Sequence, residues 1–353
     1  MDRKSHAAQA AEGEKPMKKI SVIIPCHNAV KWLPKCFLSL VSQTIEISNI
    51  ELIFVDDASD DEGATWEMLQ EFERAYPEDI LILHLEENMR QGGARNAAFP
   101  YATGEYLAFV DADDFVTEDF LEKTYKKAKE TNADILQFEY FYYTDRLGAV
   151  PTNRRITPAV FQIHTPEERK TFLLSEKITY GCWNKLYRRE LVQQAGVQYA
   201  EHVIYEEPLF VYPLLFYGNK FVITDEVFYF YRQNDGGTMR SDMKQFETLK
   251  MHMSVQLSLW HFMKQTPFFT EYYEEIKLYF LHSYFYETLY FARQRDFSIP
   301  WELYLELETT VRKEVPGFST SIYETVIPLQ MELCRLAESG MDKETLQAFL
   351  AKI

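Results

Sequence analysis

The stretch ISVIIPCHNAVKWLPKCFLSLVSQT, residues 20–44, decides the fold class of this chain. It opens with an apolar run, 20–25, that hardly alternates with polar residues, as in a strand buried on both faces of a parallel sheet. A helical pattern follows over 30–43, with Leu33, Phe37 and Leu40 on one face. A buried strand followed by an amphipathic helix is half of a βαβ unit, so the stretch predicts an α/β domain.

The same pattern recurs through the first part of the chain. Further apolar runs occupy 51–56, 80–85 and 106–111, and helical patterns occupy 61–76 and 92–101. The strands begin about 30 residues apart, which is the length of one βαβ unit. We therefore expect an open, mostly parallel mixed sheet wound with right-handed crossovers.

The remainder of the chain has a different pattern. Helical segments dominate over 167–217, FVITDEVFYFY at 221–231 is β-like, and the pattern is helical from residue 244 onward. The helices expected there are 244–264, 269–295, 301–315 and 323–351. We predict a disordered leader at 1–17, a catalytic domain at 18–240 and a helical C-terminal region at 241–353.

One expected helix is unusually aromatic. The segment YYEEIKLYFLHSYFYETLYF, residues 272–291, carries few charges among many rings. The plainer interpretation is a helix packed against the catalytic domain. The alternative is a surface that faces lipid or binds an acceptor, and it would allow peripheral association with a membrane.

Composition excludes several classes of protein. The formal net charge is −17, which repels phosphate backbones and argues against nucleic-acid binding. The sequence contains no run of about 18 uncharged apolar residues, so it predicts no transmembrane helix. The polar residues 1–16 do not resemble a signal peptide. The four cysteines have no paired spacing, which fits a reducing, cytoplasmic setting and argues against a thiolate zinc site.

Polar and acidic residues follow the predicted strands. In open α/β sheets ligands bind outside the carboxyl ends of the strands. The residues found there are Pro25-Cys26-His27-Asn28, Asp56-Asp57, Asn88 with Arg90, and Asp111-Ala112-Asp113-Asp114. Side chains two apart on an extended exit face the same side. Asp111 and Asp113 thus suit Mg²⁺ or Mn²⁺, which prefer oxygen ligands. The alternative is an acidic loop that only caps the helix expected near residue 117.

These segments resemble a known family. The quoted stretch 20–44, IELIFVDDASDD (50–61), EENMRQGGARNAAFPYATGEYLAFVDADD (86–114) and CWNKLYRREL (182–191) are similar, in order and spacing, to inverting glycosyltransferases of family 2. The resemblance covers about 18–240. It implies a GT-A fold, a UDP-sugar donor, a divalent metal ion and a glycan or lipid-linked acceptor, in bacterial surface-polysaccharide or cell-wall synthesis. The chain departs from the family pattern at His27, Ala58 and the pair Glu206-Glu207.

The resemblance also implies residue roles. Asp57 would accept a hydrogen bond from uracil, and Arg95 would lie near the base and order Asp57. Asp111 and Asp113 would serve the metal ion, with Asp111 also near the ribose. The full donor-binding set is Pro25, His27, Asn28, Asp57, Asn88, Arg95, Asp111, Lys185 and Arg232.

Two of these assignments have plainer alternatives. Arg232 resembles a phosphate clamp beside a closing loop that holds Gly236-Gly237-Thr238, but a surface arginine after a strand has the same pattern. Trp183, beside Lys185, resembles a residue that faces sugar and acceptor, but an ordinary core aromatic would also stand there.

The resemblance also implies a catalytic base: Glu207 stands where the family has its base Asp and Glu206 where the preceding Glu is common, with Asp114 as a further candidate. Glu206 and Glu207 stand at the predicted start of a helix, where two acids can also simply favour the helix dipole. A base would accept the proton of the attacking hydroxyl. Two other classes remain open: a nucleotide- or carbohydrate-binding protein without turnover, and a glycoside hydrolase. The sequence predicts no particular oligomeric state.

Overall fold

The computed structural model describes residues 17–152, 156–233, 245–294 and 299–353. The predicted leader therefore lies outside the described residues except for Met17. The predicted boundary at 240/241 and the loop segment Gly236-Gly237-Thr238 also lie outside them.

The first part of the chain forms parallel strands in the predicted places. They are β1 (Ile20–Cys26), β2 (Ile50–Asp56), β3 (Ile80–His84) and β4 (Tyr106–Phe109). Their order in the sheet is β3-β2-β1-β4, and each neighbouring pair is parallel. Every residue of β1 is buried, as the unbroken apolar run predicts.

The sheet continues as a mixed sheet beyond β4. The order there is β4-β9-β6-β10-β5, with β7 paired to β6 and β8 to β10. β9 is antiparallel to both of its neighbours, whereas β6 and β10 run parallel. The bounds are β5 Phe115–Val116, β6 Ile135–Thr144, β7 Gly148–Pro151, β8 Ala159–Gln162, β9 Lys185–Arg188 and β10 Lys220–Arg232. The expected mostly parallel mixed sheet is confirmed; β10 matches the β-like run 221–231, and β6 to β9 were not predicted.

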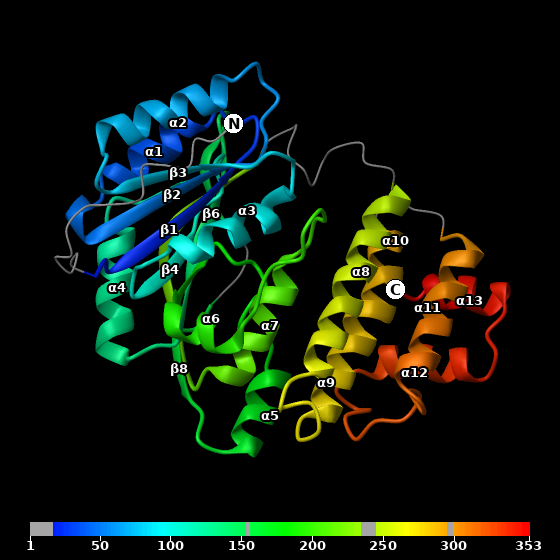
Figure 1. The fold of residues 1–353 in the computed structure, drawn as a ribbon. Helices are drawn as coiled ribbons and strands as arrows, with labels where there is room; N and C mark the ends of the chain where they lie inside the picture. Colours follow the sequence, from blue (N-terminus) through cyan, green and yellow to red (C-terminus); the bar gives the residue numbers. More distant parts are fainter. Residues whose placement is uncertain (1–16, 153–155, 234–244, 295–298) are drawn as a thin grey trace.

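Helices cover both faces of the sheet (Figure 1). The side chains of β1 alternate between two apolar clusters, one holding Ile20, Val22 and Ile24 and the other Ile23. α1 (Leu33–Val41), α2 (Ala64–Ala75) and α4 (Phe120–Thr131) supply the first cluster. The second is supplied by α3 (Arg90–Ala98), α5 (Pro166–Leu174), α6 (Arg189–Ala195) and α7 (Glu207–Tyr217). Short 3₁₀ turns lie at Ile47–Asn49 and Phe99–Tyr101.

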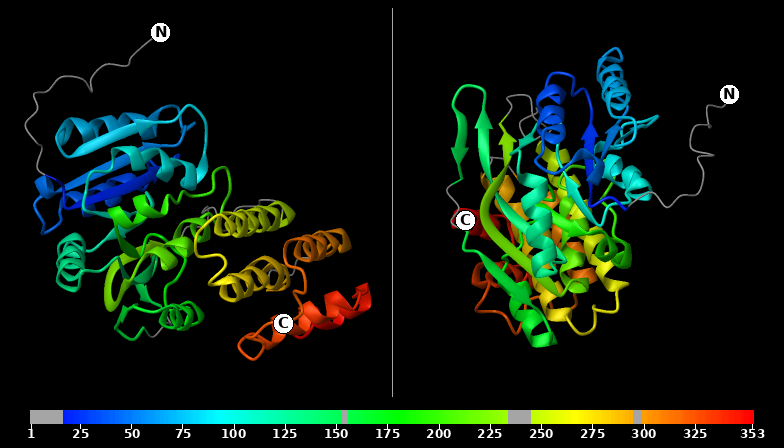
Figure 2. Two further views of the ribbon diagram at one scale, coloured as in Figure 1. Left: turned by 60° about the horizontal axis from the view of Figure 1, so that its bottom comes forward. Right: turned by 90° about the vertical axis from the view of Figure 1, so that its left-hand side faces the viewer.

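The C-terminal region is helical and lies beside the sheet domain (Figure 2). Its elements are α8 (Gln245–Lys264), α9 (Tyr273–Phe280), a π-helical turn (Leu281–Tyr286), α10 (Glu287–Gln294), α11 (Trp301–Glu314), α12 (Pro328–Glu338) and α13 (Lys343–Leu350). The single helix predicted over 323–351 is wrong, because the chain turns at Gly340 with φ +87° and a new helix starts with Asp342 as its N-cap.

The aromatic segment 272–291 packs inside the protein. The Tyr279 ring stacks on Tyr212 of α7 with ring centroids 4.0 Å apart, and Phe280 stacks on Trp260 of α8. These residues belong to one apolar cluster that runs from Ile23 in the sheet to Leu350 in the last helix. The packed interpretation of this segment therefore holds. Across the described ranges, no helix is both long and apolar enough to cross a bilayer.

All four cysteines are buried and unpaired. They are Cys26, Cys36, Cys182 and Cys334. Burial raises the pKa of each thiol, in the cases of Cys182 and Cys334 to about 12.

Candidate functional site

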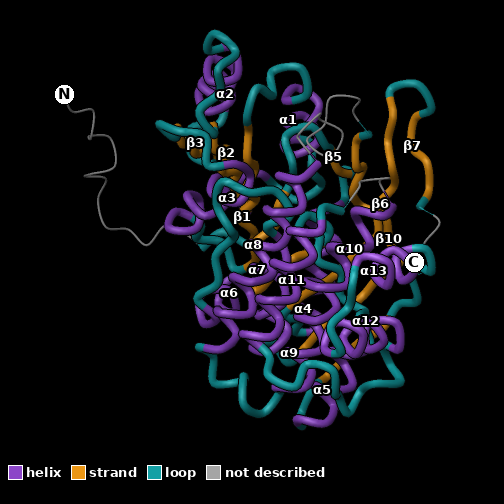
Figure 3. The backbone as a smooth tube through the Cα atoms, turned by 90° about the vertical axis from the view of Figure 1, so that its right-hand side faces the viewer, coloured by secondary structure: helices purple, strands orange, loops and turns teal. Residues whose placement is uncertain are grey.

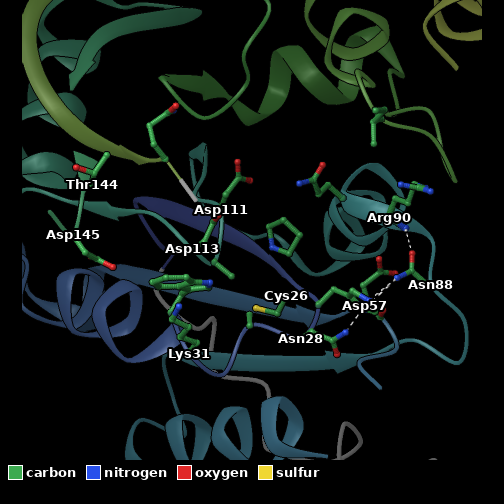
Figure 4. Close-up of a pocket in the computed structure, with 18 of the residues that line it drawn as sticks. Cys26, Asn28, Lys31, Asp57, Asn88, Arg90, Asp111, Asp113, Thr144 and Asp145 are labelled. Atoms are coloured by element: carbon green, nitrogen blue, oxygen red, sulfur yellow. Dashed lines mark hydrogen bonds between the residues drawn. The ribbon is translucent and has the colours of Figure 1, made fainter. Parts of the chain in front are cut away.

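A cavity of about 1280 Å³ opens at the carboxyl ends of β1, β2 and β4. It brings together sequence-predicted residues from separate segments of the chain: Pro25, His27, Asn28, Asp57, Asn88, Asp111 and Asp113. In Figure 4, Asn28, Asp57, Asn88 and Arg90 lie on one side of Asp111 and Asp113, and Thr144 and Asp145 lie on the other. The edge of the sheet where a ligand was expected thus borders a single cavity.

Asp57 is held in place by the start of α3. Its Oδ1 accepts the backbone N–H of Met89 at 2.7 Å, and its own carbonyl lies 2.9 Å from Nδ1 of His27. Burial raises the pKa of Asp57 above its ordinary value, although the Met89 contact opposes that effect. The carboxylate is therefore fixed at the wall of the cavity.

The loops after β1 and β2 are tied together beside Asp57. The Asn28 backbone N–H donates to Oγ of Ser59 at 2.9 Å, and its amide Nδ2 donates to Oδ1 of Asp60 at 2.6 Å. Asp56 is fully buried; it accepts the Ser59 hydroxyl at 2.5 Å and lies 2.7 Å from Nδ1 of His84. Asp56 thus serves a structural role, and hydrogen bonds connect the two loops beside the cavity.

Asp111 and Asp113 follow β4 and both line the cavity. Asp111 donates its backbone N–H to the hydroxyl of Tyr229 at 3.1 Å, and its side chain is 17% exposed. Among the described residues, no group of three or more His, Cys, Asp or Glu side chains forms a metal cage. Mg²⁺ and Mn²⁺ are commonly held by one or two carboxylates plus substrate phosphates, so the pair fits such an ion once a diphosphate is present.

Arg95 lies elsewhere than the sequence predicted. Its guanidinium donates from Nη2 to Oδ1 of Asp111 at 2.7 Å and from Nη1 to Oε1 of Glu206 at 2.5 Å. The expected ordering of Asp57 comes instead from the backbone of Met89. The physical reason is the direction of α3: its N-terminus reaches Asp57, whereas Arg95, one and a half turns on, points toward β4 and α7.

Two predicted site residues face the interior. Asp114 is 1% exposed and accepts the Tyr229 hydroxyl and the Arg232 backbone N–H, each at 2.6 Å; burial raises its pKa well above the ordinary value. Lys185 is fully buried and donates to the carbonyl of Gly181 at 2.5 Å. Neither side chain is among those that line the cavity, so the catalytic role of Asp114 and the donor-binding role of Lys185 stay predictions.

Arg232 lies behind one wall of the cavity. Its Nε donates to the Asp113 carbonyl at 2.7 Å and its Nη1 to Oδ1 of Asp145 at 2.6 Å. The guanidinium also lies over the Trp32 ring, 4.6 Å from its centroid. Arg232 thus positions three wall residues in this structure, and its role as a phosphate clamp stays a prediction.

The candidate base stands at the start of a helix, as predicted. Glu207 is the first residue of α7, Glu206 is its N-cap, and Pro208 lies in the first turn. Burial, and then the charge of Glu206, raise the pKa of Glu207 above its ordinary value. Ile204, three residues earlier, lines the cavity. The role of Glu207 as the base stays a prediction.

The sequence analysis missed a hairpin that supplies one end of the cavity. β6 and β7 form this hairpin at the edge of the sheet (Figure 3), and its tip, 144–147, lines the cavity together with Lys31, Trp32 and Gln233. A signal was present: a run of aromatics in β6, 140–143, is followed closely by Asp-Arg-Leu-Gly, and Gly148 has φ +70°. Glycine in that region is typical of a tight hairpin.

Known proteins with similar sequences are glycosyltransferases. Residues 21–196 match the sequence family described as Glycosyl transferase family 2. The glycosyltransferase GlyA of Streptococcus pneumoniae is 33% identical over 187 residues, which is 50% of this chain and 25% of GlyA. A cholesterol galactosyltransferase of Borreliella burgdorferi is 25% identical over 317 residues, covering 85% of this chain and 84% of that protein.

The fold has a solved counterpart. The structure of residues 1–349 of TarS from Staphylococcus aureus, in complex with UDP-GlcNAc, superimposes with a TM-score of 0.70 at 19% identity, over 94% of this chain and 89% of that one. The matched region spans 25% of GlyA, 84% of the cholesterol galactosyltransferase and 32% of a poly(ribitol-phosphate) beta-glucosyltransferase of Bacillus spizizenii. The chain is therefore a member of glycosyltransferase family 2, with a GT-A fold followed by a helical C-terminal region.

Proposed function

We propose that this glycosyltransferase is metal-dependent and inverting, and that it moves a hexosyl or N-acetylhexosaminyl group from a UDP-sugar to a hydroxyl of a glycan or lipid-linked acceptor. The observation that carries the proposal is that Asp57, Asp111 and Asp113 line one cavity. Asp57 offers a fixed hydrogen-bond acceptor for the nucleobase, and Asp111 and Asp113 offer two carboxylates for a hard cation. A nucleotide diphosphate needs both.

The residues divide the work along the cavity. Asp57 accepts the N3–H of uracil, and the rigid loops of His27 and Asn28 line the nucleotide. Asp111 and Asp113 hold Mn²⁺ or Mg²⁺, which when bound neutralises the charge of the leaving diphosphate. Glu207 accepts the proton of the attacking hydroxyl. Attack opposite the leaving group inverts the anomeric carbon, so an α-linked donor gives a β-linked product.

The similar proteins support the setting of the reaction. Two of them are named as poly(ribitol-phosphate) glycosyltransferases, one from Bacillus spizizenii and one from Staphylococcus aureus, and another as a cholesterol galactosyltransferase. We place this chain in surface-polysaccharide or cell-wall glycan synthesis, in the cytoplasm or peripherally at the inner face of the membrane. The proposed division is a catalytic domain at 18–240 and a helical region at 241–353.

Metal-linked nucleotide binding tests the proposal. UDP should bind more tightly with Mn²⁺ than with a chelator in titration calorimetry, because Asp111 and Asp113 would hold an ion whose charge favours the diphosphate. Asp113→Ala should remove that difference. Asp225→Ala, at an exposed acid outside the cavity wall, is the matched control and should keep it. Equal UDP affinity with and without metal in the unaltered chain would refute the metal-dependent site. Binding of UDP-sugars with no turnover would instead favour a binding protein.

A further inference from the structure

A buried arginine joins the two functional sides of the cavity. Arg95 of α3 is 1% exposed, and its guanidinium contacts Asp111 after β4 and Glu206 at the N-cap of α7. A planar guanidinium donates in fixed directions, so two such contacts set both the distance and the angle between their acceptors. Asp111 lines the cavity, and Glu206 immediately precedes Glu207.

Independent contacts dock the same face of α3 onto the segment before α7. Asn96 donates to the Tyr199 carbonyl at 3.0 Å and accepts the Tyr199 N–H at 2.8 Å. The Met89 carbonyl accepts the His202 N–H at 3.0 Å. A Cβ atom at Gly92 would lie 2.2 Å from the Ala200 carbonyl oxygen and 3.0 Å from Cγ of Glu206, so the helix approaches as closely as only glycine permits.

We propose that Arg95 is a positioning residue that fixes the first turn of α7, and with it Glu207, relative to Asp111. This inference rests on the proposed roles of Asp111 and Glu207. Its physical basis is the low exposure of both partners: Glu206 is 2% exposed and the Asp111 side chain 17% exposed, so without a cation between them the two carboxylates would repel each other and α7 would move away. Arg95 itself does not line the cavity, so it acts through its two partners.

The geometry distinguishes this role from donor binding. A donor-binding arginine would face the cavity with free N–H groups. Both terminal nitrogens of Arg95 are instead occupied by Asp111 and Glu206, and the Nε atom is buried without an acceptor among the described residues. Loss of Arg95 should therefore alter the chemical step far more than nucleotide affinity.

Arg95→Lys is the informative variant, because lysine keeps the charge but cannot donate from a planar fork to two carboxylates. Three measurements are made on it: UDP affinity with Mn²⁺, hydrogen exchange of the first intrahelically bonded amides of α7, at 210–212, and kcat and KM for UDP release from UDP-GlcNAc and UDP-glucose. We expect kcat to fall by about 10- to 100-fold, as for other lost supporting contacts. UDP affinity and KM should change by less than about threefold. Exchange at the start of α7 should become faster.

Two further variants separate positioning from general destabilisation. Glu206→Gln retains an oxygen that can accept from Arg95 and should lose less activity than Glu206→Ala. Arg169 is the matched control, since it is also a buried arginine but donates to the Leu215 and Gly218 carbonyls, away from the cavity. Arg169→Met should lower the melting temperature without the change in kcat.

The outcomes are distinct. Unchanged kcat and unchanged exchange in Arg95→Lys would overturn the proposal. A loss of UDP affinity equal to the loss of kcat, with α7 exchange unchanged, would also overturn it and assign Arg95 to the donor site. If the unaltered chain neither binds UDP nor consumes a UDP-sugar, the proposed function fails. The exchange comparison then decides alone whether Arg95 positions α7.

Discussion

At the scale of single residues, Asp57 should decide which base the cavity accepts. Its carboxylate can accept the N3–H of uracil, whereas N3 of cytosine carries no proton and would face the carboxylate with a lone pair. UDP should therefore bind more tightly than CDP, and Asp57→Ala should narrow the gap. Titration of both nucleotides at the same Mn²⁺ concentration measures this. Tighter binding of CDP or GDP by the unaltered chain would refute the UDP assignment.

Glu207 should give the reaction its dependence on pH. A general base works only when ionised, and burial raises the pKa of Glu207 above its ordinary value. Activity should consequently fall as the pH is lowered, and the fall should begin well above the reference carboxyl pKa of about 4.3. Glu207→Gln should keep UDP affinity and lower kcat by about 100-fold or more. It should also abolish the fall in activity at low pH, the acidic limb of the pH profile.

The profile of kcat against pH for both chains provides the measurement. Glu206→Gln is the comparison, because it alters the neighbouring acid and leaves Glu207 in place; it should retain the limb. Retention of near-normal transfer by Glu207→Gln would mean that another residue is the base.

Residue types at strand ends were readable from the sequence, but side-chain directions were not. Asp57, Asp111 and Asp113 were placed correctly because parallel strands bring their carboxyl ends to one edge. Asp114 follows Asp113 directly, yet it turns inward to Tyr229, a partner more than a hundred residues away. Lys185 likewise satisfies a loop carbonyl. Only tertiary contacts determine which of two adjacent acids faces a ligand.

At the scale of elements, α3 should tolerate no side chain at Gly92. In an isolated helix, glycine to alanine stabilises by about 1 kcal/mol. Here the added Cβ would lie 2.2 Å from the Ala200 carbonyl oxygen, so overpacking should outweigh that gain. Gly92→Ala should lower the melting temperature. Gly181→Ala, whose Cβ would meet its nearest atom at 3.5 Å, should have little effect. A higher melting temperature for Gly92→Ala would contradict this packing.

The strands also show where a sequence pattern predicts secondary structure and where it does not. β1 to β4 were predicted because their unbroken apolar runs are bounded by polar residues. β6 was missed because its pattern changes along its length: the first residues are buried and the aromatic end is partly exposed at the hairpin. β8 alternates intermediate and exposed positions at an edge, so little burial marks it. Edge strands take their structure from pairing more than from their own composition.

At the scale of the whole molecule, the C-terminal helices should be needed for a stable sheet domain. Tyr212 of α7 is 3% exposed because Tyr279 covers its ring. Removing residues 245–353 would expose this and neighbouring apolar side chains, so the truncated chain should be less soluble and should bind a hydrophobic dye. Soluble fraction and dye fluorescence measure the change. A soluble, active truncated enzyme would show that the helices serve another purpose.

The reactivity of the four buried thiols can report whether the chain unfolds cooperatively. Thiolates are the form that attacks alkylating reagents, so raised pKa values and burial should keep every cysteine unreactive in the folded protein. Cys182 beside the sheet and Cys334 in α12 belong to the same apolar cluster. Under mild denaturation both should become reactive together, as read by mass spectrometry of pulse-labelled protein. Labelling of Cys334 first would instead reveal that the helices open as a separate unit.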